Sequence, residues 1–472
     1  MDQDPAIAPF PSSNSPRDVQ SPRPQTAREA AFHALQEWYD HGDFLAATLD
    51  RIFRDAPPQE RRLARELSFG VVRRIATIDA ILAPHVSRPR EKVEDALWML
   101  LRLGAYQIVF LDGIPSHAAV HETVELARRL GQPRWCGFVN AVLRRLVDAV
   151  TGELVDSPAN DAVPLASGRY RRLSVPVLPD PSFNRGAWLA SAFSLPRWLV
   201  DRWSSRFSPD ELVNLGFWFN APSHVWLRTN THKTTRDSLL ASLVNAGIDA
   251  APGSRPESIC LVGAVAVEAL PGYADGLFVV QDESAMAAAP LLDPQPGDTI
   301  LDLCAAPGGK TTHLAERMRN HGRIVAVDVS AERLRRVEEN AARLGISIVE
   351  TRTIHEDGSD IPAGPFDAAL LDVPCSNTGV LGRRPEARWR LEPKDIHELS
   401  VIQRRLLDAA LRRVKPGGRV VYSTCSIEDE ENSVVVRETL ERHPAFKVVK
   451  EIRHFPGKPV DGGYLALVRR SS

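Results

Sequence analysis

The chain has 472 residues, 43% of them apolar and 25% charged, and this length predicts two to four domains rather than one small module. Lysine and arginine (58) nearly balance aspartate and glutamate (60), so overall charge does not identify a partner. The five scattered cysteines are too few for a disulfide framework, and no apolar run reaches the roughly 18 residues of a membrane span. We therefore expect a cytoplasmic protein with reduced thiols and no membrane segment.

The first 148 residues predict a leader followed by a helical domain. Residues 1–24 are rich in proline and serine, and we expect them to be disordered. The peptide Thr26 to Glu29 has the form of a capping box, which begins a helix. Apolar residues then recur at intervals of three and four, most clearly in residues 63–74, 93–110, 117–130 and 138–147. Residues 25–148 are therefore predicted to form an all-α bundle.

The rest of the chain predicts a linker and two further domains. Residues 149–186 contain five prolines among polar residues and no sustained period, which is typical of a linker. Residues 187–287 mix helical stretches with a strand-like run at 225–228, which predicts a small α+β, RRM-like module. From residue 288 to 472, strands and helices alternate. This pattern predicts a Rossmann-like α/β domain with a parallel sheet and helices on both faces.

A loop of small residues follows the predicted strand 299–303. In order, it contains Cys304, Ala305, Ala306, Pro307, Gly308, Gly309 and Lys310. The loop lies where a doubly wound sheet binds ligands, but it matches neither the dinucleotide fingerprint nor the P-loop. Asp328 ends the next strand, where a carboxylate can accept hydrogen bonds from ribose hydroxyls. These features predict a nucleoside cofactor without phosphates, S-adenosyl-L-methionine, with Asp357 as a candidate for adenine contact.

Two cysteines follow further predicted strands of the same sheet. Cys375 lies just after Asp372, and Cys425 follows the strand at 419–422. Because carboxyl ends of parallel strands share one edge, both thiols are predicted to lie near the cofactor loop. Zinc is the competing explanation, but the cysteines form no C-x-x-C pair and have no histidine at ligand spacing. We expect no metal.

A thiolate beside a methyl donor has a specific chemical use. Its addition to carbon 6 of a pyrimidine makes carbon 5 nucleophilic enough to take a methyl group, after which the carbon 5 proton leaves and the thiol is eliminated. One thiol would attack and the other would help release, while Asp372 hydrogen-bonds the ring near nitrogen 3. Chemistry alone does not decide whether Cys375 or Cys425 attacks.

Several peptides of the chain resemble a known family. Five peptides resemble motifs of the Nop/Sun family of RNA cytosine-5 methyltransferases: DLCAAPGGKT (302–311), DVPCSNTGV (372–380), YSTCSIEDEEN (422–432), QDESAM (281–286) and RTN (228–230). The NusB-like domain of its bacterial RsmB-type members resembles LRLGAYQIVFLDGIPSHAAVHETVELAR (101–128) and GFVNAVLRR (137–145). The C-terminal DGGY (461–464) and Met286 depart from the family pattern.

The resemblance implies roles for individual residues. It implies that Cys425 is the nucleophile, that Cys375 assists release and that Lys310 lies near the reaction centre. It further implies a donor pocket lined by residues 304–310, Asp328, Asp357 and Asp372. A basic contact to the target RNA is implied for Arg383, Arg384, Arg388 and Arg390, which flank a tryptophan.

The resemblance also implies an activity, with two alternatives kept open. The expected activity is methylation of carbon 5 of a cytidine in 16S ribosomal RNA, naked or in an early assembly intermediate, by a monomer with an RNA-binding NusB-like domain. A target base must leave its stack to reach a thiol. The alternatives are a transfer-RNA cytosine-5 methyltransferase and a non-catalytic RNA-binding or antitermination factor.

Overall fold

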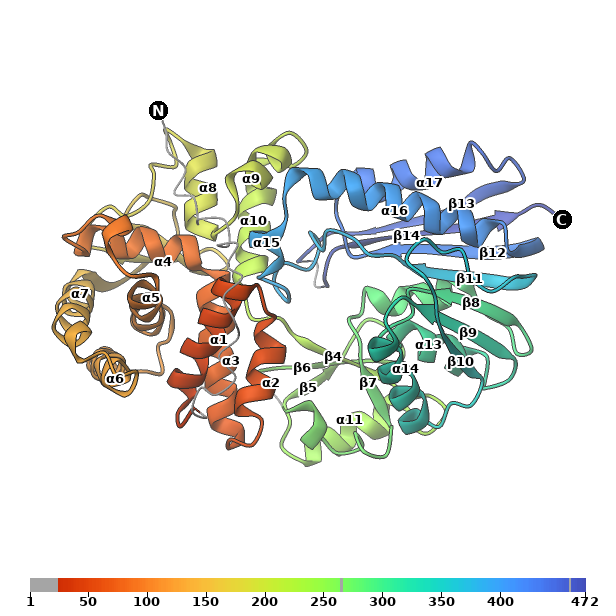
Figure 1. Cartoon of the computed structure of the whole chain (residues 1–472), viewed down its shortest axis with the longest axis horizontal. Helices are drawn as coiled ribbons and strands as arrows, with labels where there is room; N and C mark the ends of the chain where they lie inside the picture. The colour runs from red at the N-terminus through yellow and green to blue at the C-terminus, as the bar shows by residue number, and fades with distance from the viewer. Residues whose placement is uncertain (1–23, 264–265, 458–459) are drawn as a thin grey trace. The chain divides into compact units, whose positions relative to one another are not determined.

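The computed structural model describes residues 24–263, 266–457 and 460–472. The chain divides into two compact units, one ending at Pro222 and the other beginning at Ser223, and Figure 1 identifies their elements. The predicted leader, except for Pro24, lies outside the described residues. Within the described ranges, no helix is both long enough and apolar enough to cross a membrane.

The first unit begins with a helical bundle, as predicted. Its helices are α1 (Ala27–His41), α2 (Leu45–Phe53), α3 (Pro58–Arg73), α4 (Ile75–Leu82), α5 (Asp95–Phe110), α6 (Ser116–Arg129) and α7 (Cys136–Ala149), with 3-10 turns at Ala83–His85, Arg90–Lys92 and Pro133–Trp135. Thr26 caps α1 by accepting a hydrogen bond from the Glu29 backbone. Helix α5 contacts α1, α3, α4, α6 and α7. The residues of α5 from Leu97 to Val109 are therefore buried on every face.

The segment predicted to be a linker contains a folded sheet. Its strands β1 (Val150–Val155), β2 (Ala162–Ala166) and β3 (Arg169–Leu173) pair antiparallel in the order β1-β3-β2. Tyr170 of β3 packs its ring 5.4 Å from that of Phe217 and 6.5 Å from that of Trp188. These partners lie on α8 (Arg185–Phe193) and α10 (Pro209–Asn220), which complete the unit with α9 (Arg197–Ser204). The predicted module 187–287 thus spans the division between the units.

The second unit begins with a four-stranded antiparallel sheet in the order β5-β6-β4-β7. Its elements are β4 (Val225–Thr229), α11 (Arg236–Asn245), β5 (Ala250–Pro252), β6 (Ser258–Leu261), a 3-10 turn at Val267–Ala269 and β7 (Phe278–Val280). Leu227, Leu239, Ile259 and Phe278 form the core between the helix and the sheet. The strand predicted at 225–228 and the helix predicted after residue 236 are confirmed.

A seven-stranded sheet forms the rest of the second unit, in the order β10-β9-β8-β11-β12-β14-β13. Its strands are β8 (Thr299–Leu303), β9 (Arg323–Asp328), β10 (Val349–Thr353), β11 (Phe366–Asp372), β12 (Val414–Thr424), β13 (Phe446–His454) and β14 (Gly463–Arg470). Strands β8 to β12 run parallel, whereas β14 pairs antiparallel with β12 and with β13. The strand order reverses at β8 and β11, which is where such sheets bind ligands.

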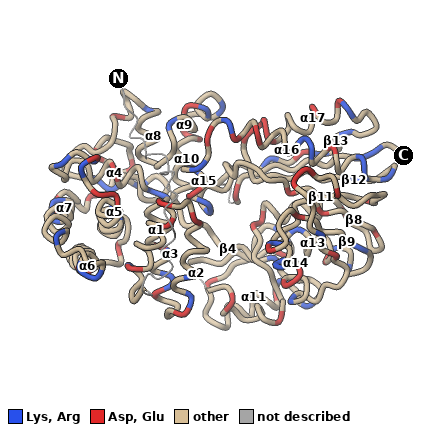
Figure 2. Tube along the Cα trace, in the orientation of Figure 1, with Lys and Arg blue, Asp and Glu red and all other residues tan. Residues whose placement is uncertain are grey.

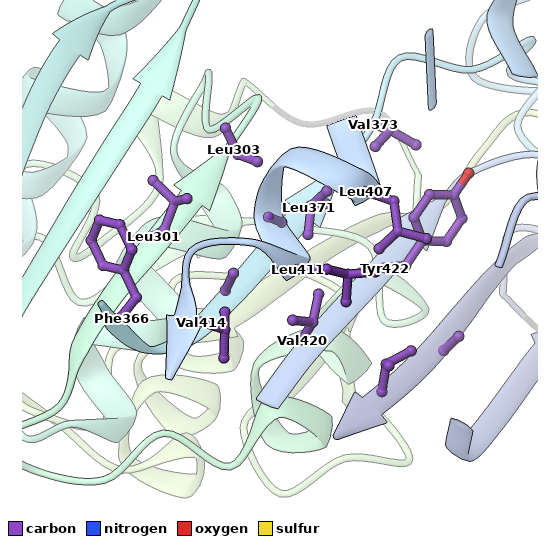
Figure 3. Close-up of a cluster of buried hydrophobic side chains, with 14 of the residues drawn as sticks. Leu301, Leu303, Phe366, Leu371, Val373, Leu407, Leu411, Val414, Val420 and Tyr422 are labelled. Carbon is purple, nitrogen blue, oxygen red and sulfur yellow. The ribbon is translucent and has the colours of Figure 1, made fainter. Parts of the chain in front are cut away.

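Helices cover both faces of this sheet (Figure 1). They are α12 (Ala288–Leu292), α13 (Gly309–Arg317), α14 (Ala331–Leu344), α15 (Ala387–Arg390), α16 (Pro393–Leu411) and α17 (Ser433–Leu440), with 3-10 turns at Ala285–Ala287 and Asp429–Glu431. Alternate residues of β11 face opposite cores: Leu371 packs with Leu407 of α16 (Figure 3), and Leu370 packs with Leu314 of α13. The predicted Rossmann-like domain is confirmed.

Charges of both signs are interspersed along the two units in Figure 2. The arrangement agrees with the near balance of 58 basic and 60 acidic residues in the sequence. A nucleic-acid surface in this protein would therefore be local, and individual arginines have to be followed one by one.

Candidate active site

The cofactor loop joins β8 to α13 through a backbone that only small residues permit. Cys304 has φ of 61° and Gly308 has φ of 98°. A Cβ at Gly308 would lie 3.0 Å from the Cα of Val337, so glycine is required there by both conformation and space. At Gly309, in contrast, a Cβ would meet only Gln281, at 3.9 Å. The loop is thus packed tightly on α14 but open over the first turn of α13.

A buried carboxylate lies beneath this loop. Asp302, on β8, is 1% exposed, and its Oδ2 accepts a hydrogen bond of 2.6 Å from the Thr311 hydroxyl. Its Oδ1 has no hydrogen-bond partner in the described part of the chain. Burial raises the pKa of Asp302 to about 7. Burial also raises the pKa of Cys304 to about 12, so this third cysteine of the domain stays a neutral thiol at physiological pH.

Asp328 lies against the same loop, at the end of β9. Its Oδ2 accepts a hydrogen bond of 3.3 Å from the Ala306 backbone, and its Oδ1 accepts one of 3.1 Å from the Ser330 backbone. Arg333 ties the two parts together by donating to the Ala306 carbonyl at 2.7 Å and to Asp328 at 3.5 Å. The structure therefore brings the loop and this predicted ribose ligand together.

Asp357 is placed less closely. It follows β10 on an exposed loop, and its carboxylate accepts a hydrogen bond of 2.9 Å from the Ser359 backbone, which lowers the pKa of Asp357. The start of the loop is anchored at the site, because the Ile354 backbone donates to the Asp328 carbonyl at 3.1 Å. The contact of Asp357 with a cofactor stays a prediction.

Lys310 and Asp372 form an ion pair between the cofactor loop and the cysteine peptides. Their Nζ and Oδ1 atoms are 2.5 Å apart, and the Ser423 hydroxyl donates to the same Oδ1 at 3.2 Å. Lys310 lies in the first turn of α13, Asp372 ends β11 and Ser423 lies near the end of β12. Two strand ends and one helix start therefore meet at one point, on the edge of the sheet that the sequence predicts.

The two predicted thiols are adjacent. Cys375 Sγ and Cys425 Sγ are 3.2 Å apart, and both side chains are half-buried. The hydrogen bond from Cys375 lowers the pKa of the Cys425 thiol, against the effect of burial, and Arg384 lowers it further. The same bond, together with burial, raises the pKa of Cys375 well above its usual range. Cys425 is thus the better thiolate of the pair.

Asn377 was not predicted, yet it contacts both cysteines. Its side-chain amide donates to the Cys375 carbonyl at 2.9 Å, while its Oδ1 accepts from the Cys425 thiol at 3.3 Å and from Arg384 at 2.9 Å. Asn377 has φ of 61°, a conformation that asparagine adopts more readily than most residues. The sequence could have indicated Asn377 only through its position two residues after Cys375, because the peptide has no apolar period that would place its side chain.

A buried glutamate behind the cysteines was also missed. Glu431 is fully buried, and its carboxylate accepts hydrogen bonds from Ser376 and Ser426, the residues that follow Cys375 and Cys425. Burial raises the pKa of Glu431. The sequence offers one signal, the serine that follows each of the two cysteines. The acidic run at 428–431, in contrast, is typical of a solvent-exposed surface and does not indicate a buried carboxylate.

The four predicted RNA-binding arginines have different environments. Arg384 is exposed, and Arg390 is partly exposed. Arg383 is ion-paired with Asp461 and, at 2.6 Å, with Asp282. Arg388 is fully buried and donates to the Leu381 carbonyl at 3.2 Å. The prediction for Arg388 is therefore wrong, because a buried guanidinium that bonds to its own chain does not reach an RNA phosphate.

A metal site is not found near the thiols. Across the ranges that the structure describes, no three histidine, cysteine, aspartate or glutamate side chains are grouped to hold a metal ion. Asp302 Oδ2, Asp328 and Glu431 instead accept hydrogen bonds from hydroxyl and guanidinium donors.

Comparisons with known proteins match each part of the chain. The NusB family matches residues 25–148, the ferredoxin-like domain of Methyltr_RsmF/B-like proteins matches residues 195–268, and 16S rRNA methyltransferase RsmB/F matches residues 289–461. The ribosomal RNA small subunit methyltransferase B of Vibrio cholerae is 34% identical over 456 residues, which cover 94% of this chain and 97% of that relative. The protein of that name from Salmonella paratyphi B is 34% identical over 423 residues, covering 88% and 90%.

Solved structures share the fold. The crystal structure of PH0851 has a TM-score of 0.75 and 26% identity, covering 95% of this chain and 99% of that chain. A methyltransferase homolog protein from Pyrococcus horikoshii has a TM-score of 0.54 and 28% identity, covering 62% of this chain and all of that one (100%). Fold and site together define a Rossmann-like methyltransferase that carries NusB and ferredoxin-like domains. More particularly, the chain belongs to the 16S rRNA methyltransferase RsmB/F family.

Proposed function

We propose that this protein methylates carbon 5 of a cytidine in small-subunit ribosomal RNA, with S-adenosyl-L-methionine as donor and a covalent Cys425 adduct as intermediate. The observation that carries the proposal is the pair of thiols, whose sulfur atoms are 3.2 Å apart. They follow β11 and β12, at the same edge of the sheet as the Lys310–Asp372 ion pair. The names of the relatives, ribosomal RNA small subunit methyltransferase B, support the choice of ribosomal RNA.

The residues around the loop fit such a cofactor. Asp302 Oδ1 is a buried acceptor without a partner among the residues that the structure describes, and Asp328 is a carboxylate at the strand end where ribose hydroxyls would bind. The space next to Gly309 is open. The loop lacks the glycine patterns with which nucleotide-binding loops hold a diphosphate. Residues 304–310, Asp328 and Asp357 would hold the nucleoside end, with Asp372 and Lys310 next to the reacting end. When bound, the cofactor supplies an electrophilic methyl group.

The chain's own groups supply the remaining chemistry. Cys425, as thiolate, forms a bond to carbon 6, and the electrons of the carbon 5–carbon 6 double bond move toward nitrogen 3, which takes a proton from the Lys310–Asp372 ion pair. Carbon 5 then takes the methyl group. Cys375 assists removal of the carbon 5 proton, which leaves to water, the double bond re-forms and the carbon–sulfur electron pair returns to Cys425. Nitrogen 3 returns its proton to the ion pair, so one proton is released for each methyl group transferred.

The proposal also assigns parts of the chain to the RNA. Residues 25–148 form the NusB-like domain that would bind RNA, residues 187–287 the middle module and residues 288–472 the methyltransferase domain. Arg384 is exposed and bonded to Asn377, so it can reach a phosphate beside the target base. Arg390 is the second candidate. Arg383, held by two carboxylates, would act by holding the segment rather than by free contact.

The thiol roles predict distinct products for two variants. Cys425→Ala removes the nucleophile, so methylation of small-subunit RNA with labelled donor should fall below detection. Cys375→Ala leaves the attacking thiol in place but impairs release, so turnover should fall by about 10²- to 10⁴-fold and an RNA adduct that survives denaturation should accumulate. Gel electrophoresis of denatured protein with labelled RNA measures the adduct.

Cys136→Ala, on α7 of the other unit, is the matched control and should behave as the wild type. Methylation at the wild-type rate by Cys425→Ala would contradict the covalent mechanism. Mapping of the modified nucleotide distinguishes ribosomal from transfer RNA, and a protein that fails to bind the donor would favour a non-catalytic RNA-binding factor.

A further inference from the structure

Glu431 is a buried carboxylate without an ion-pair partner. It lies on the 3-10 turn after β12 and is fully buried, yet in the described part of the chain no lysine, arginine or histidine pairs with it. A buried carboxylate is costly unless hydrogen bonds replace its water. Four donors do so here: the Ser376 backbone at 2.8 Å, the Ser376 hydroxyl, the Ser426 hydroxyl at 2.5 Å and the Gln403 amide at 3.0 Å.

These donors come from the two cysteine peptides. Ser376 follows Cys375 after β11, and Ser426 follows Cys425 after β12, so one carboxylate ties together two segments that are 50 residues apart. The two hydroxyls are themselves 3.1 Å apart. Gln403 of α16 strengthens the tie, because its amide donates to the Glu431 carboxylate and also to the Pro374 carbonyl, at 2.9 Å.

A second group joins the same segments. The Thr378 hydroxyl lies 3.1 Å from the Ser426 hydroxyl and accepts a hydrogen bond of 3.1 Å from the Ile427 backbone. In addition, the Gly379 backbone donates to the Cys425 carbonyl at 2.9 Å. The two cysteine peptides are therefore joined, through the residues that follow the thiols, by a network centred on Glu431.

We propose that Glu431 is the positioning residue that holds the Cys375 and Cys425 thiols next to each other, by fixing the residue that follows each of them. A shift of about 1 Å in a reacting group can cost about 100-fold in rate. The catalytic meaning of this inference rests on the proposed function, in which one thiol attacks and the other assists release. The geometric part of the inference, that this carboxylate sets the distance between the two sulfur atoms, does not depend on the proposed function.

Phenylarsine oxide tests the geometric part without RNA or cofactor. Its arsenic(III) centre forms bonds to two neighbouring thiol sulfurs, and the two thiol protons leave with its oxygen as one water molecule. The wild-type chain should bind one equivalent through the thiol pair, and Cys425→Ala should abolish that binding. Glu431→Ala should weaken it about tenfold or more, because the two peptides lose their common acceptor.

Glu431→Gln is the conservative variant that keeps the test open if the alanine variant does not fold. The amide keeps one acceptor oxygen, so it should retain the fold and weaken arsenical binding about threefold. Glu441→Ala is the matched control, because it removes an exposed carboxylate at the end of α17. This variant should bind phenylarsine oxide as the wild type does. Thermal unfolding and donor binding report whether each variant is folded.

Methylation gives the second readout. Positioning predicts that the turnover number falls in both Glu431 variants while the KM for S-adenosyl-L-methionine stays within about twofold, because the donor loop is on other elements. Wild-type arsenical binding by both variants, or losses that only follow the folded fraction, would overturn the inference. If instead methylation proves independent of Cys425, the proposed function fails, and the arsenical result still decides whether Glu431 holds the thiols together.

Discussion

At the scale of single residues, Asp302 is a carboxyl group whose charge near neutral pH depends on folding. Its side chain is buried on β8, its Oδ1 has no hydrogen-bond partner among the described residues, and burial raises its pKa to about 7. The unfolded chain titrates this carboxyl near its ordinary value of about 3.9. Between these two values the folded protein binds more protons than the unfolded one, so the free energy of unfolding falls as pH rises through this window.

Asp302→Asn is therefore expected to change the pH dependence of stability. From pH 4 to pH 7 the wild type should lose up to about 4 kcal/mol more than the variant, since each pKa unit is worth about 1.4 kcal/mol. Above pH 7 the difference should be constant. Urea unfolding at pH 4.5, 6 and 7.5 measures it, and parallel curves for the two proteins would contradict a raised pKa at Asp302. Asp357→Asn is the control: it keeps Asp302, and hydrogen bonding lowers the pKa of the exposed Asp357 out of this window, so this variant should lose as much stability as the wild type.

Residue types in sequence motifs predicted which thiol, amine and carboxyl groups lie together, but not the groups that hold them. Cys375, Cys425, Lys310 and Asp372 follow predicted strands, so the position of each could be inferred from topology alone. Glu431 could not, because an acidic run is usually solvated and its burial depends on donors supplied by two distant peptides. The prediction of an RNA contact by Arg388 was wrong because the sequence shows the charge of this residue but not that its side chain is buried.

At the scale of elements, Arg228 of β4 connects the middle sheet to the cofactor helix. Its fully buried guanidinium donates to the Gly309 carbonyl at 2.6 Å, to the Thr312 hydroxyl at 3.0 Å and to Glu316 at 2.8 Å, and it also bonds Gln281. Gly309, Thr312 and Glu316 all lie on α13. The start of this helix, and with it the donor loop, is therefore fixed from the middle module.

Arg228→Ala should destabilise the protein by about 3–5 kcal/mol, because it leaves the buried Glu316 carboxylate unpaired. It should also weaken donor binding, since the Gly309 carbonyl loses its guanidinium donor. Arg323→Ala is the matched control: that arginine, exposed at the start of β9, forms a two-bond ion pair with Glu350 of β10, and its replacement should cost less than about 1 kcal/mol. Chemical denaturation and donor titration measure both effects, and equal costs for the two variants would contradict the role of Arg228.

Most elements could be predicted because their signals are local. The bundle helices and the strands of the parallel sheet carry apolar periods of their own. Strand β8 coincides with the predicted strand 299–303, and β9 ends at Asp328, as predicted. The sheet β1–β3 was missed because its strands have only five or six residues, because β2 contains a proline, and because further prolines lie in the same segment. Its stability comes from rings on α8 and α10, which no local pattern reveals.

At the scale of the whole molecule, the proposed reacting groups and the NusB-like domain proposed to bind RNA lie in different units of the chain. Every residue proposed to hold the donor or to react lies in the unit that begins at Ser223, whereas the NusB match covers residues 25–148 of the other unit. The second unit has its own cores, one in the antiparallel sheet and others on the two faces of the parallel sheet. A division of this kind could not be predicted from composition, since both units contain interspersed charges (Figure 2).

A fragment of residues 223–472 is therefore expected to bind S-adenosyl-L-methionine with a Kd within about threefold of that of the full chain. Its methylation of ribosomal RNA should differ in one parameter: the KM for RNA should rise at least tenfold, while the turnover number at saturating RNA stays close to that of the full chain. The reason is that a remote RNA-binding domain contributes equally to the ground state and the transition state. Calorimetry and steady-state kinetics measure the two quantities. A folded fragment that binds the donor but has lost turnover at saturating RNA would instead mean that the first unit takes part in assembling the reacting groups.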